Sequence, residues 1–293
     1  MSYFGQQFLN GIGSGAIYAS LGLALVLIYR ATNIVNFAQG EMAAFSAFLI
    51  WQLQQWGVPI ILALIGAIIL SMLIGGLVYA IVVRPVQNRE EVTIVIVTIG
   101  LFLGFNSASG AIWGYLQKAL PSPFPAVTWY LGGLRISGDL VGTCILLAAI
   151  VLGLYLLFQH TKIGLTLRAA ASNAESSMLV GVPFIWMMIV GWGLSAGVGA
   201  ISGALVAPHL SLDPNMMITV IIYAFAAAVL GGLASYSGAI VGGLLVGVSQ
   251  SLTTAYLPSL GADLQVIVPL GIMVAVLAIK PEGLFGRSVM ARV

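Results

Sequence analysis

Long apolar runs, separated by short polar stretches, make up most of the chain. A helix of about 20 apolar residues crosses roughly 30 Å of hydrocarbon, so each run fits a membrane span. The expected spans are Gln7–Tyr29, Asn33–Trp56, Val58–Val83, Val92–Trp113, Asp139–Phe158, Phe184–Ala207, Asn215–Leu233, Gly238–Tyr256 and Asp263–Ile279. The pattern predicts one all-α, polytopic transmembrane domain over residues 1–293. We expect about nine spans, in a range of about eight to ten, because the Gly-rich region Leu230–Gly247 could form half-helices.

One polar segment interrupts this pattern, QHTKIGLTLRAAASNAESSMLVGVP, residues 159–183. It contains Arg168 and Glu175, and a charged side chain costs about 2.5–3.5 kcal/mol at the bilayer centre on insertion scales. The segment is also far too short to form a catalytic domain. We therefore predict a short, largely helical element at the membrane surface, through which a cytoplasmic partner moves the helices on either side.

The basic residues predict the orientation of the chain. Only 6% of its residues are charged, against 60% hydrophobic. With about nine spans, eight of the ten basic residues fall on one side, namely Arg30, Arg84, Arg89, Lys162, Arg168, Lys280, Arg287 and Arg292; Lys118 and Arg135 fall on the other. By the positive-inside rule, the N-terminus is outside, and segment 159–183 and the C-terminus are cytoplasmic.

The most informative polar residues inside an expected span are Asn33, Asn36, Gln39 and Glu41, with Gly40 among them. If the helix begins near Asn33, Glu41 lies about 12 Å along it, and Asn33, Asn36 and Gly40 share one face. Ionisable residues at such depth tend to mark a pathway. The alternative is a surface loop with the helix beginning at Glu41, whose charge favours a helix N-terminus. A broken helix is a compromise, allowed only where protein buries it.

Other polar side chains carry weaker signals. Hydroxyls in membrane helices usually bond to their own backbone or a neighbouring helix, so helix packing is the default for the fourth span; Thr98 is the residue that could line a passage. His209 and Asp213 lie together, but two groups without a third make no metal site. The polar residues of the fourth span are Thr93, Thr98, Asn106, Ser107 and Ser109.

The sequence lacks the motifs of several enzyme classes. No lysine follows a glycine, so there is no Walker A phosphate-binding loop, and HExxH does not occur. The single cysteine, Cys144, lies in an apolar run. We expect a protein without catalytic residues, metal site, bound cofactor or nucleic-acid partner, whose energy comes from outside the chain.

Five motifs, in this order, carry a resemblance that covers nearly the whole chain. They are NIVNFAQGE at Asn33–Glu41, VTIGLFL at Val97–Leu103, KIGLTLRAAASNAESSMLVGV in the polar segment, LGGLASYSGAIVGGLLVG at Leu230–Gly247, and KPEGLFG at Lys280–Gly286. The chain resembles the membrane permease subunits of bacterial ABC importers for branched-chain and other hydrophobic amino acids, a family that also includes urea permeases.

The resemblance implies a set of partners and a mechanism. A related second permease chain would complete the passage in the bacterial inner membrane, two cytoplasmic ATPase subunits would bind ATP and Mg²⁺, and an external binding protein would deliver substrate by alternating access. Segment 159–183 would be the coupling segment that docks on an ATPase. Its contact residues would be Thr166, Arg168, Ala169, Ala170, Asn173, Glu175, Leu179 and Gly181, and the pathway residues Asn33, Asn36, Gln39, Glu41 and Thr98.

Three other functions stay open. A permease for urea or short amides belongs to the same class, and the sequence does not separate it from an amino-acid permease. An ion-coupled secondary transporter would need several buried carboxylates or a clear inverted repeat, whereas only Glu41 is a plausible deep acid. A structural scaffold would have no polar face inside the bundle.

Overall fold

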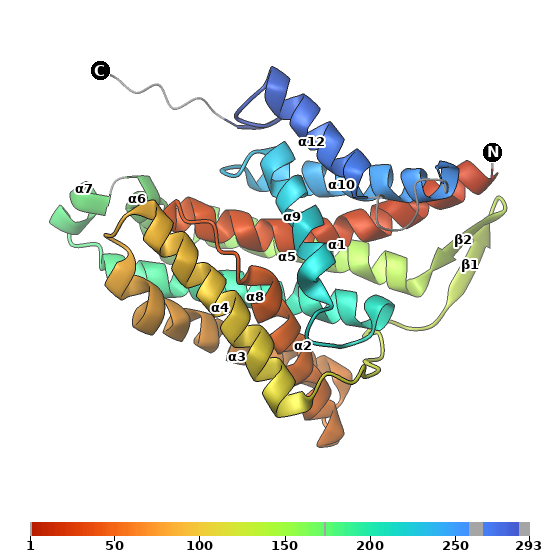
Figure 1. The fold of residues 1–293 in the computed structure, drawn as a ribbon, viewed down its shortest axis with the longest axis horizontal. Helices are drawn as coiled ribbons and strands as arrows, with labels where there is room; N and C mark the ends of the chain where they lie inside the picture. Colours follow the sequence, from red (N-terminus) through yellow and green to blue (C-terminus); the bar gives the residue numbers. More distant parts are fainter. Residues whose placement is uncertain (1, 173, 258–265, 287–293) are drawn as a thin grey trace. The chain divides into compact units, whose positions relative to one another are not determined.

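The computed structural model describes residues 2–172, 174–257 and 266–286 (Figure 1). The described chain is mainly helical. Its helices are α1 (Ser2–Thr32), α2 (Gln39–Gln55), α3 (Ile60–Val78), α4 (Glu91–Trp113), α5 (Gly138–His160), α6 (Lys162–Ser172), α7 (Ala174–Leu179), α8 (Phe184–Leu210), α9 (Met217–Gly231), α10 (Tyr236–Tyr256) and α12 (Ile267–Ile279). A short antiparallel hairpin, β1 (Thr128–Leu131) and β2 (Leu134–Ser137), precedes α5.

Six of the described helices are long and apolar enough to cross a membrane: the helical segments at Tyr3–Thr32, Ile60–Val86, Glu91–Trp113, Gly138–His160, Phe184–Leu210 and Tyr236–Tyr256. The apolar helices α9 and α12 are shorter. The prediction of a polytopic helical membrane protein is therefore confirmed. The expected ninth span began at Asp263, which lies outside the described residues, and α12 begins at Ile267.

The chain forms two compact units. Unit 1 comprises Met1–Val26, Phe124–Leu147 and Ile221–Val293, and unit 2 comprises Leu27–Pro123 and Ala148–Val220. The division falls inside α1, α5 and α9, so these three helices contribute residues to both units.

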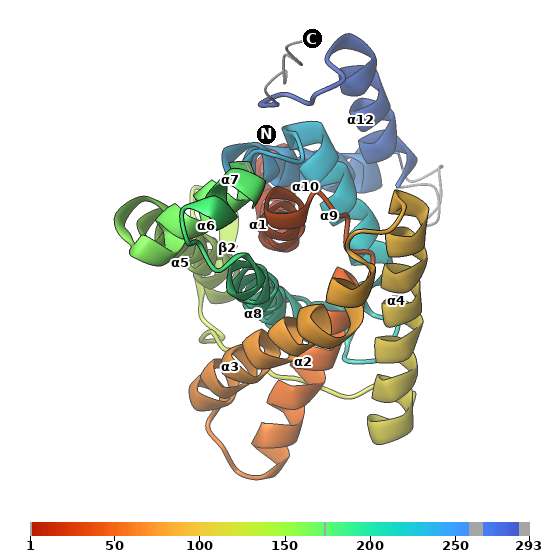
Figure 2. The ribbon, with the colours of Figure 1, turned by 90° about the vertical axis from the view of Figure 1, so that its left-hand side faces the viewer.

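Unit 2 is built around α8. Helices α2 and α3 form a hairpin, seen in orange in Figure 2, and both pack extensively against α8. Small residues permit this packing: a Cβ atom added to Gly203 of α8 would lie 2.2 Å from the carbonyl oxygen of Ala43 in α2. In lipid, where apolar association gains little, such close backbone approach supplies van der Waals contact.

The end of α3 changes its winding. After α3 comes a π-helical turn, Tyr79–Val83, and then a 3₁₀ turn, Arg84–Val86. Pro85 lacks the N–H that a continuing α-helix would need. Tyr79 is fully buried, its ring lies 6.1 Å from that of Trp192, and its hydroxyl donates to Gln87. The π turn thus places one aromatic side chain in the core of unit 2.

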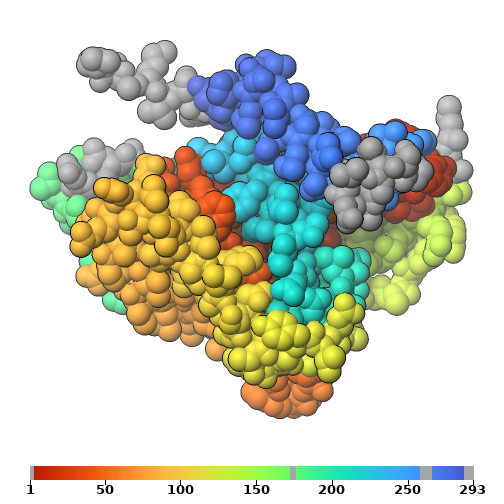
Figure 3. Space-filling model, in the orientation of Figure 1, coloured from red at the N-terminus to blue at the C-terminus, as the bar shows by residue number. Residues whose placement is uncertain are grey.

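In contrast, α4 is poorly covered by its own chain. Its large apolar side chains Ile96, Leu103 and Ile112 are 59–62% exposed. Figure 3 shows α4 in orange to yellow on the surface of unit 2. In a membrane protein such a face suits lipid or another apolar helix, since neither demands polar contacts.

Unit 1 is held by another close helix pair. In the first half of α1, Gly15 lies so near α10 that a Cβ atom would meet the Leu244 Cα at 2.8 Å. The Tyr18 hydroxyl donates to Gln250 Oε1 at 2.7 Å, and its ring stacks on Tyr223 at 4.9 Å. The hairpin β1–β2 lies between the predicted spans Val92–Trp113 and Asp139–Phe158, and its Trp129 and Tyr130 are exposed.

Candidate functional site

Residues 33–38 form a non-helical break between α1 and α2, where a helix starting near Asn33 was one of the alternatives. Asn33 ends α1 with φ 55°, a left-handed conformation that asparagine tolerates better than most residues. Its side chain is exposed. The helical spacing proposed for Asn33, Asn36 and Gly40 is therefore wrong, as is the 12 Å position of Glu41, which is the third residue of α2.

Asn36 and Gln39 are buried and tie the start of α2 to α8. Asn36 Oδ1 accepts from the Ala38 amide at 3.0 Å, and its Nδ2 donates to Gln39 Oε1 at 3.3 Å. Gln39 Nε2 donates to the Ser195 carbonyl at 3.2 Å, and the Ser195 hydroxyl donates back to Gln39 Oε1 at 3.2 Å. These amides satisfy one another, so their first role in unit 2 is to fix the break against α8.

Glu41 lies in a different polar cluster, which we call the Glu41 cluster: Glu41, Asn106, Pro214 and Asn215. Asn106 Nδ2 lies 3.2 Å from Glu41 Oε2, 3.1 Å from the Pro214 carbonyl oxygen and 3.0 Å from Asn215 Oδ1. Glu41 is 1% exposed, and within the described chain its Oε1 has no hydrogen-bond partner. The cluster joins α2 and α4 to the link between α8 and α9.

The side chains near the Glu41 cluster are apolar. Ala38 at the end of the break and Met42 of α2 pack with Ala196 of α8, and Leu101, Phe102 and Phe105 of α4 cover them. One turn further along α2, the ring of Phe45 lies 5.5 Å from Phe105 and 5.2 Å from Trp113. The carboxylate is thus set beside an apolar and aromatic wall, in which an unpaired charge is costly.

Thr98 does not join either polar cluster. Its side chain is fully buried, but its hydroxyl donates to the Val95 carbonyl of its own helix at 2.9 Å. This is the usual way in which a membrane helix satisfies a hydroxyl.

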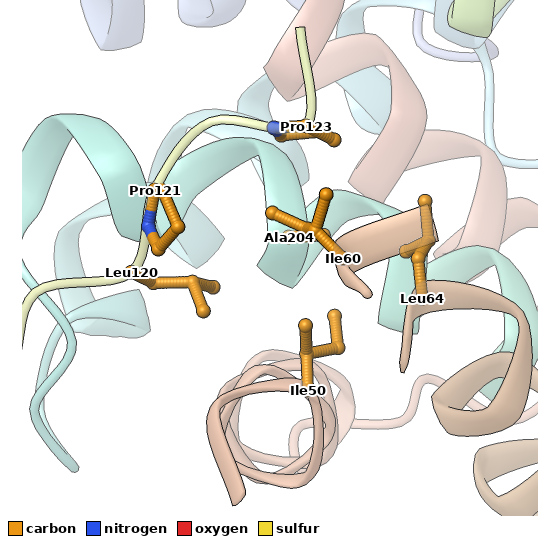
Figure 4. A pocket seen from close by; sticks show the side chains of 7 residues that line it. All are labelled: Ile50, Ile60, Leu64, Leu120, Pro121, Pro123 and Ala204. Atoms are coloured by element: carbon orange, nitrogen blue, oxygen red, sulfur yellow. The ribbon is translucent and has the colours of Figure 1, made fainter. Parts of the chain in front are cut away.

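An apolar hollow in unit 2 lies apart from the polar residues (Figure 4). Its lining comes from α2, α3, α8 and the loop after α4: Ile50, Ile60, Leu64, Leu120, Pro121, Pro123 and Ala204. Ile50 is nine residues beyond Glu41, which corresponds to about 13 Å along an α-helix. Its lining side chains are all apolar, so this hollow offers nothing to recognise a charged ligand.

The polar segment 159–183 contains the end of α5 and the short helices α6 and α7, so its described part is largely helical, as predicted. Thr161 caps α6 by accepting from the Gly164 amide at 3.0 Å, and Gly164 packs so tightly on the end of α5 that a Cβ would lie 2.1 Å from the Leu157 carbonyl oxygen. The Arg168 guanidinium donates to Gln159 Oε1 at 3.2 Å. The segment is therefore a folded part of unit 2.

The predicted coupling residues divide into two groups. Ala170 is buried in the core of unit 2, and the Thr166 hydroxyl bonds to backbone and to Met187 Sδ, so these two face the protein. Leu179 is 88% exposed, and Gly181 has φ 84°. Ala169 is half-buried. Asn173 lies outside the described residues, and only the helical backbone is described at Glu175.

Sequence reasoning undervalued two residues of the Glu41 cluster. The sequence favours helix packing as the role of Asn106, and it marks Asn215 only as the start of a span. The available signal was an amide within an apolar run, together with the Asp213-Pro214-Asn215 break before α9. Sequence spacing could not bring them together, because residues 41, 106 and 215 meet only in the folded unit. No group of three metal-ligating side chains occurs among the described residues.

Residues 7–277 match the family described as branched-chain amino acid transport system, permease component. The chain belongs to this family. It is 28% identical to the high-affinity branched-chain amino acid transport system permease protein LivH of Salmonella typhimurium, over 99% of this chain and 98% of that protein. It is 30% identical to the probable branched-chain amino acid transport permease protein LivH of Methanocaldococcus jannaschii, over 91% and 87% of the two chains.

Membership of the family confirms the predicted resemblance and the role of a transport permease in the inner membrane. The fold is similar to that of a solved structure titled PsaBC from Streptococcus pneumoniae in complex with Fab. The TM-score is 0.51 at 13% identity, with 96% of this permease chain and 93% of the other covered. At that identity the likeness concerns the fold alone.

Proposed function

We propose that this permease forms part of the translocation pathway of an ATP-driven importer for branched-chain amino acids and works by alternating access. The observation that carries the proposal is the family match over residues 7–277, supported by relatives aligned along nearly their whole length. The chain is one transmembrane domain without a nucleotide-binding site of its own. ATP and Mg²⁺ are held by two partner ATPase subunits, and a related second permease and an external binding protein complete the assembly.

The same proposal includes an orientation. With about nine crossings, eight of the ten basic residues lie on the cytoplasmic side. The N-terminus is then outside, the hairpin β1–β2 faces the binding protein, and the C-terminus and coupling segment are cytoplasmic. Short helices such as α9 are compatible with this arrangement where other helices bury their ends.

The coupling segment transmits the motion of the ATPase. Its exposed apolar side chains suit docking into a groove on a partner, and they include Ile163, Leu165, Met178, Leu179 and Val180. Its buried side, at Leu167 and Ala170, packs with Met188 and Trp192 of α8. A force applied to α6 and α7 is thereby passed to α8, around which unit 2 is built.

The substrate passes near the start of α2. The break at residues 33–38 and the link between α8 and α9 are irregular backbone in an otherwise helical unit, and transporters use such interruptions to offer polar groups at membrane depth. Glu41 is the central pathway residue. Asn36 and Gln39 hold the break open, Asn33 sets its beginning, and Thr98 contributes to the wall of α4.

Purification of the tagged chain from detergent-solubilised membranes of its own host tests the coupling role. The double variant Arg168→Glu/Glu175→Arg reverses two charges of the coupling segment, and Lys118→Glu reverses one on the opposite side. We expect an ATPase subunit to co-purify with the native chain and with Lys118→Glu, and to be lost from the double variant while it elutes as a folded protein. If no ATPase accompanies the native chain, the importer assignment is wrong.

A further inference from the structure

The Glu41 cluster contains more hydrogen-bond acceptors than donors. Its oxygens are the two of the Glu41 carboxylate, the Pro214 carbonyl and Asn215 Oδ1, and all but Glu41 Oε1 lie within 3.2 Å of the same nitrogen, Asn106 Nδ2. An amide nitrogen carries only two hydrogens, so it cannot serve three oxygens fully. The three surrounding oxygens also fix the orientation of the Asn106 amide, because the flipped form would face them with an oxygen.

The oxygen left over, Glu41 Oε1, is buried. Glu41 is 1% exposed, and its Oε1 has no partner among the described residues. A buried carboxylate oxygen without a donor is costly, and native proteins rarely keep one without a reason. The first turn of α2 lowers this cost, since a helix N-terminus favours negative charge.

The burial of the cluster is graded. Glu41 is buried, Asn106 is half-buried and Asn215 is exposed. A small polar group that enters at Asn215 meets oxygen atoms on its way to Glu41. Beside Glu41 and Asn106 in the sequence, Met42 and Phe105 belong to an apolar cluster. The arrangement suits a ligand with one multi-donor cationic group and an apolar body.

We propose that the Glu41 cluster binds the primary ammonium group of the transported amino acid, with Glu41 as its counter-ion and Pro214 O and Asn215 Oδ1 as further acceptors. A primary ammonium has three N–H donors and a positive charge, which fits an acceptor-rich site around one anionic group. The inference rests on the proposed amino-acid transport, and it assigns to Glu41 a specificity role: neutral amides such as urea lack the charge that the site compensates.

The test is thermal unfolding of the purified permease–ATPase complex without its binding protein, at constant ionic strength. The probes are L-leucine, 3-methylbutylamine, which lacks the carboxylate, and 4-methylpentanoate, which lacks the ammonium; potassium chloride tests for a plain cation site. We expect leucine and 3-methylbutylamine to raise the unfolding midpoint, and 4-methylpentanoate and potassium to leave it unchanged.

Glu41→Gln removes the charge but keeps an oxygen that can accept from Asn106. Its new N–H group takes the place of Oε1, which had no partner. The variant therefore loses no hydrogen bond of the native protein, and we expect it to fold. Loss of a charge-assisted hydrogen bond should weaken binding of leucine and 3-methylbutylamine by roughly 10- to 100-fold. Glu41→Asp should restore part of the effect. Glu91→Gln, at the exposed start of α4, is the matched control and should bind as the native complex does.

The outcomes separate this inference from the proposed function. Equal stabilisation of the native and Glu41→Gln complexes overturns the inference, and so does a native complex that transports leucine yet is stabilised by none of the ammonium probes. Stabilisation by potassium as strong as by 3-methylbutylamine overturns it in favour of an inorganic cation site. If 3-methylbutylamine binds in a Glu41-dependent way but the assembly transports no amino acid, the ammonium site stands and the proposed function fails.

Discussion

At the scale of single residues, unit 2 depends on glycines at positions where a larger side chain would not fit, and on the side-chain amides of Asn36 and Gln39, which bond to each other and to nearby groups of the break and of α8. Gly203 brings α8 onto the backbone of α2 at Ala43, and four residues earlier a Cβ on Gly199 would lie 2.5 Å from Gln39 Nε2. The glycines thus make room for the amide network that holds the break before α2. Packing and polar contacts are coupled here, so a change in one disturbs the other.

Gly203→Ala should destabilise the protein. The added Cβ would meet the Ala43 carbonyl oxygen at 2.2 Å, and backbone on both sides cannot yield as a flexible side chain would. Overpacking of this kind costs roughly 1–3 kcal/mol. Thermal unfolding in detergent, followed by size-exclusion chromatography with fluorescence detection, measures the loss. Gly104→Ala in α4 has no atom within 4 Å of its Cβ and should leave the midpoint unchanged; equal effects of the two variants would contradict the argument.

At the scale of helices, the sequence predicts the elements well and their interruptions poorly. The spans at α4, α5 and α8 were predicted to within a few residues because apolar runs and prolines define them. The sequence does not determine the start of α2, since Asn33–Glu41 is equally compatible with a polar helix and with a loop. The decision comes from Gln39, which accepts from Asn36 and bonds to Ser195 of α8, a contact that no local pattern contains. For the same reason the Glu41 cluster needed the fold to assemble it.

The corner between α5 and α6 depends on Gly164. Gly164→Val should push α6 away from the Leu157 carbonyl and misplace the coupling segment. If the cost is about 1–3 kcal/mol of coupling energy, ATP-dependent uptake falls by roughly 5- to 150-fold. Uptake into proteoliposomes, normalised to the amount of inserted chain, measures this. Gly153→Val in α5, where no atom lies within 4 Å, is the control, and uptake that is unchanged in Gly164→Val would show that the corner does not transmit motion.

At the scale of the whole molecule, the distribution of charge, the membrane spans and the sides on which the partners bind all depend on one membrane topology. The six long apolar helices found in the described chain are compatible with either orientation. What orients the chain is the distribution of its basic residues. The chain's single cysteine makes this arrangement easy to test.

A cysteine-free background, Cys144→Ser, allows single cysteines to report the orientation. Leu131→Cys, on the exposed hairpin, should react with a membrane-impermeant maleimide in intact cells, since this loop is on the outer side of the proposed topology. Ala171→Cys, exposed on α6, should react only after the membrane is permeabilised. The opposite pattern would invert the topology, and with it the assignment of the coupling segment.

The π turn at Tyr79–Val83 has a consequence for how the family diverges. A π turn accommodates one residue more than an α-helical turn, and such turns interrupt otherwise regular helices. Deleting one residue there would restore regular winding and leave both flanking turns facing as they do now. Homologues should therefore tolerate the loss of one residue between Gly76 and Pro85, which would appear as a single-codon gap when their genes are compared. A gap in the middle of α8 would instead rotate half of its buried face out of register.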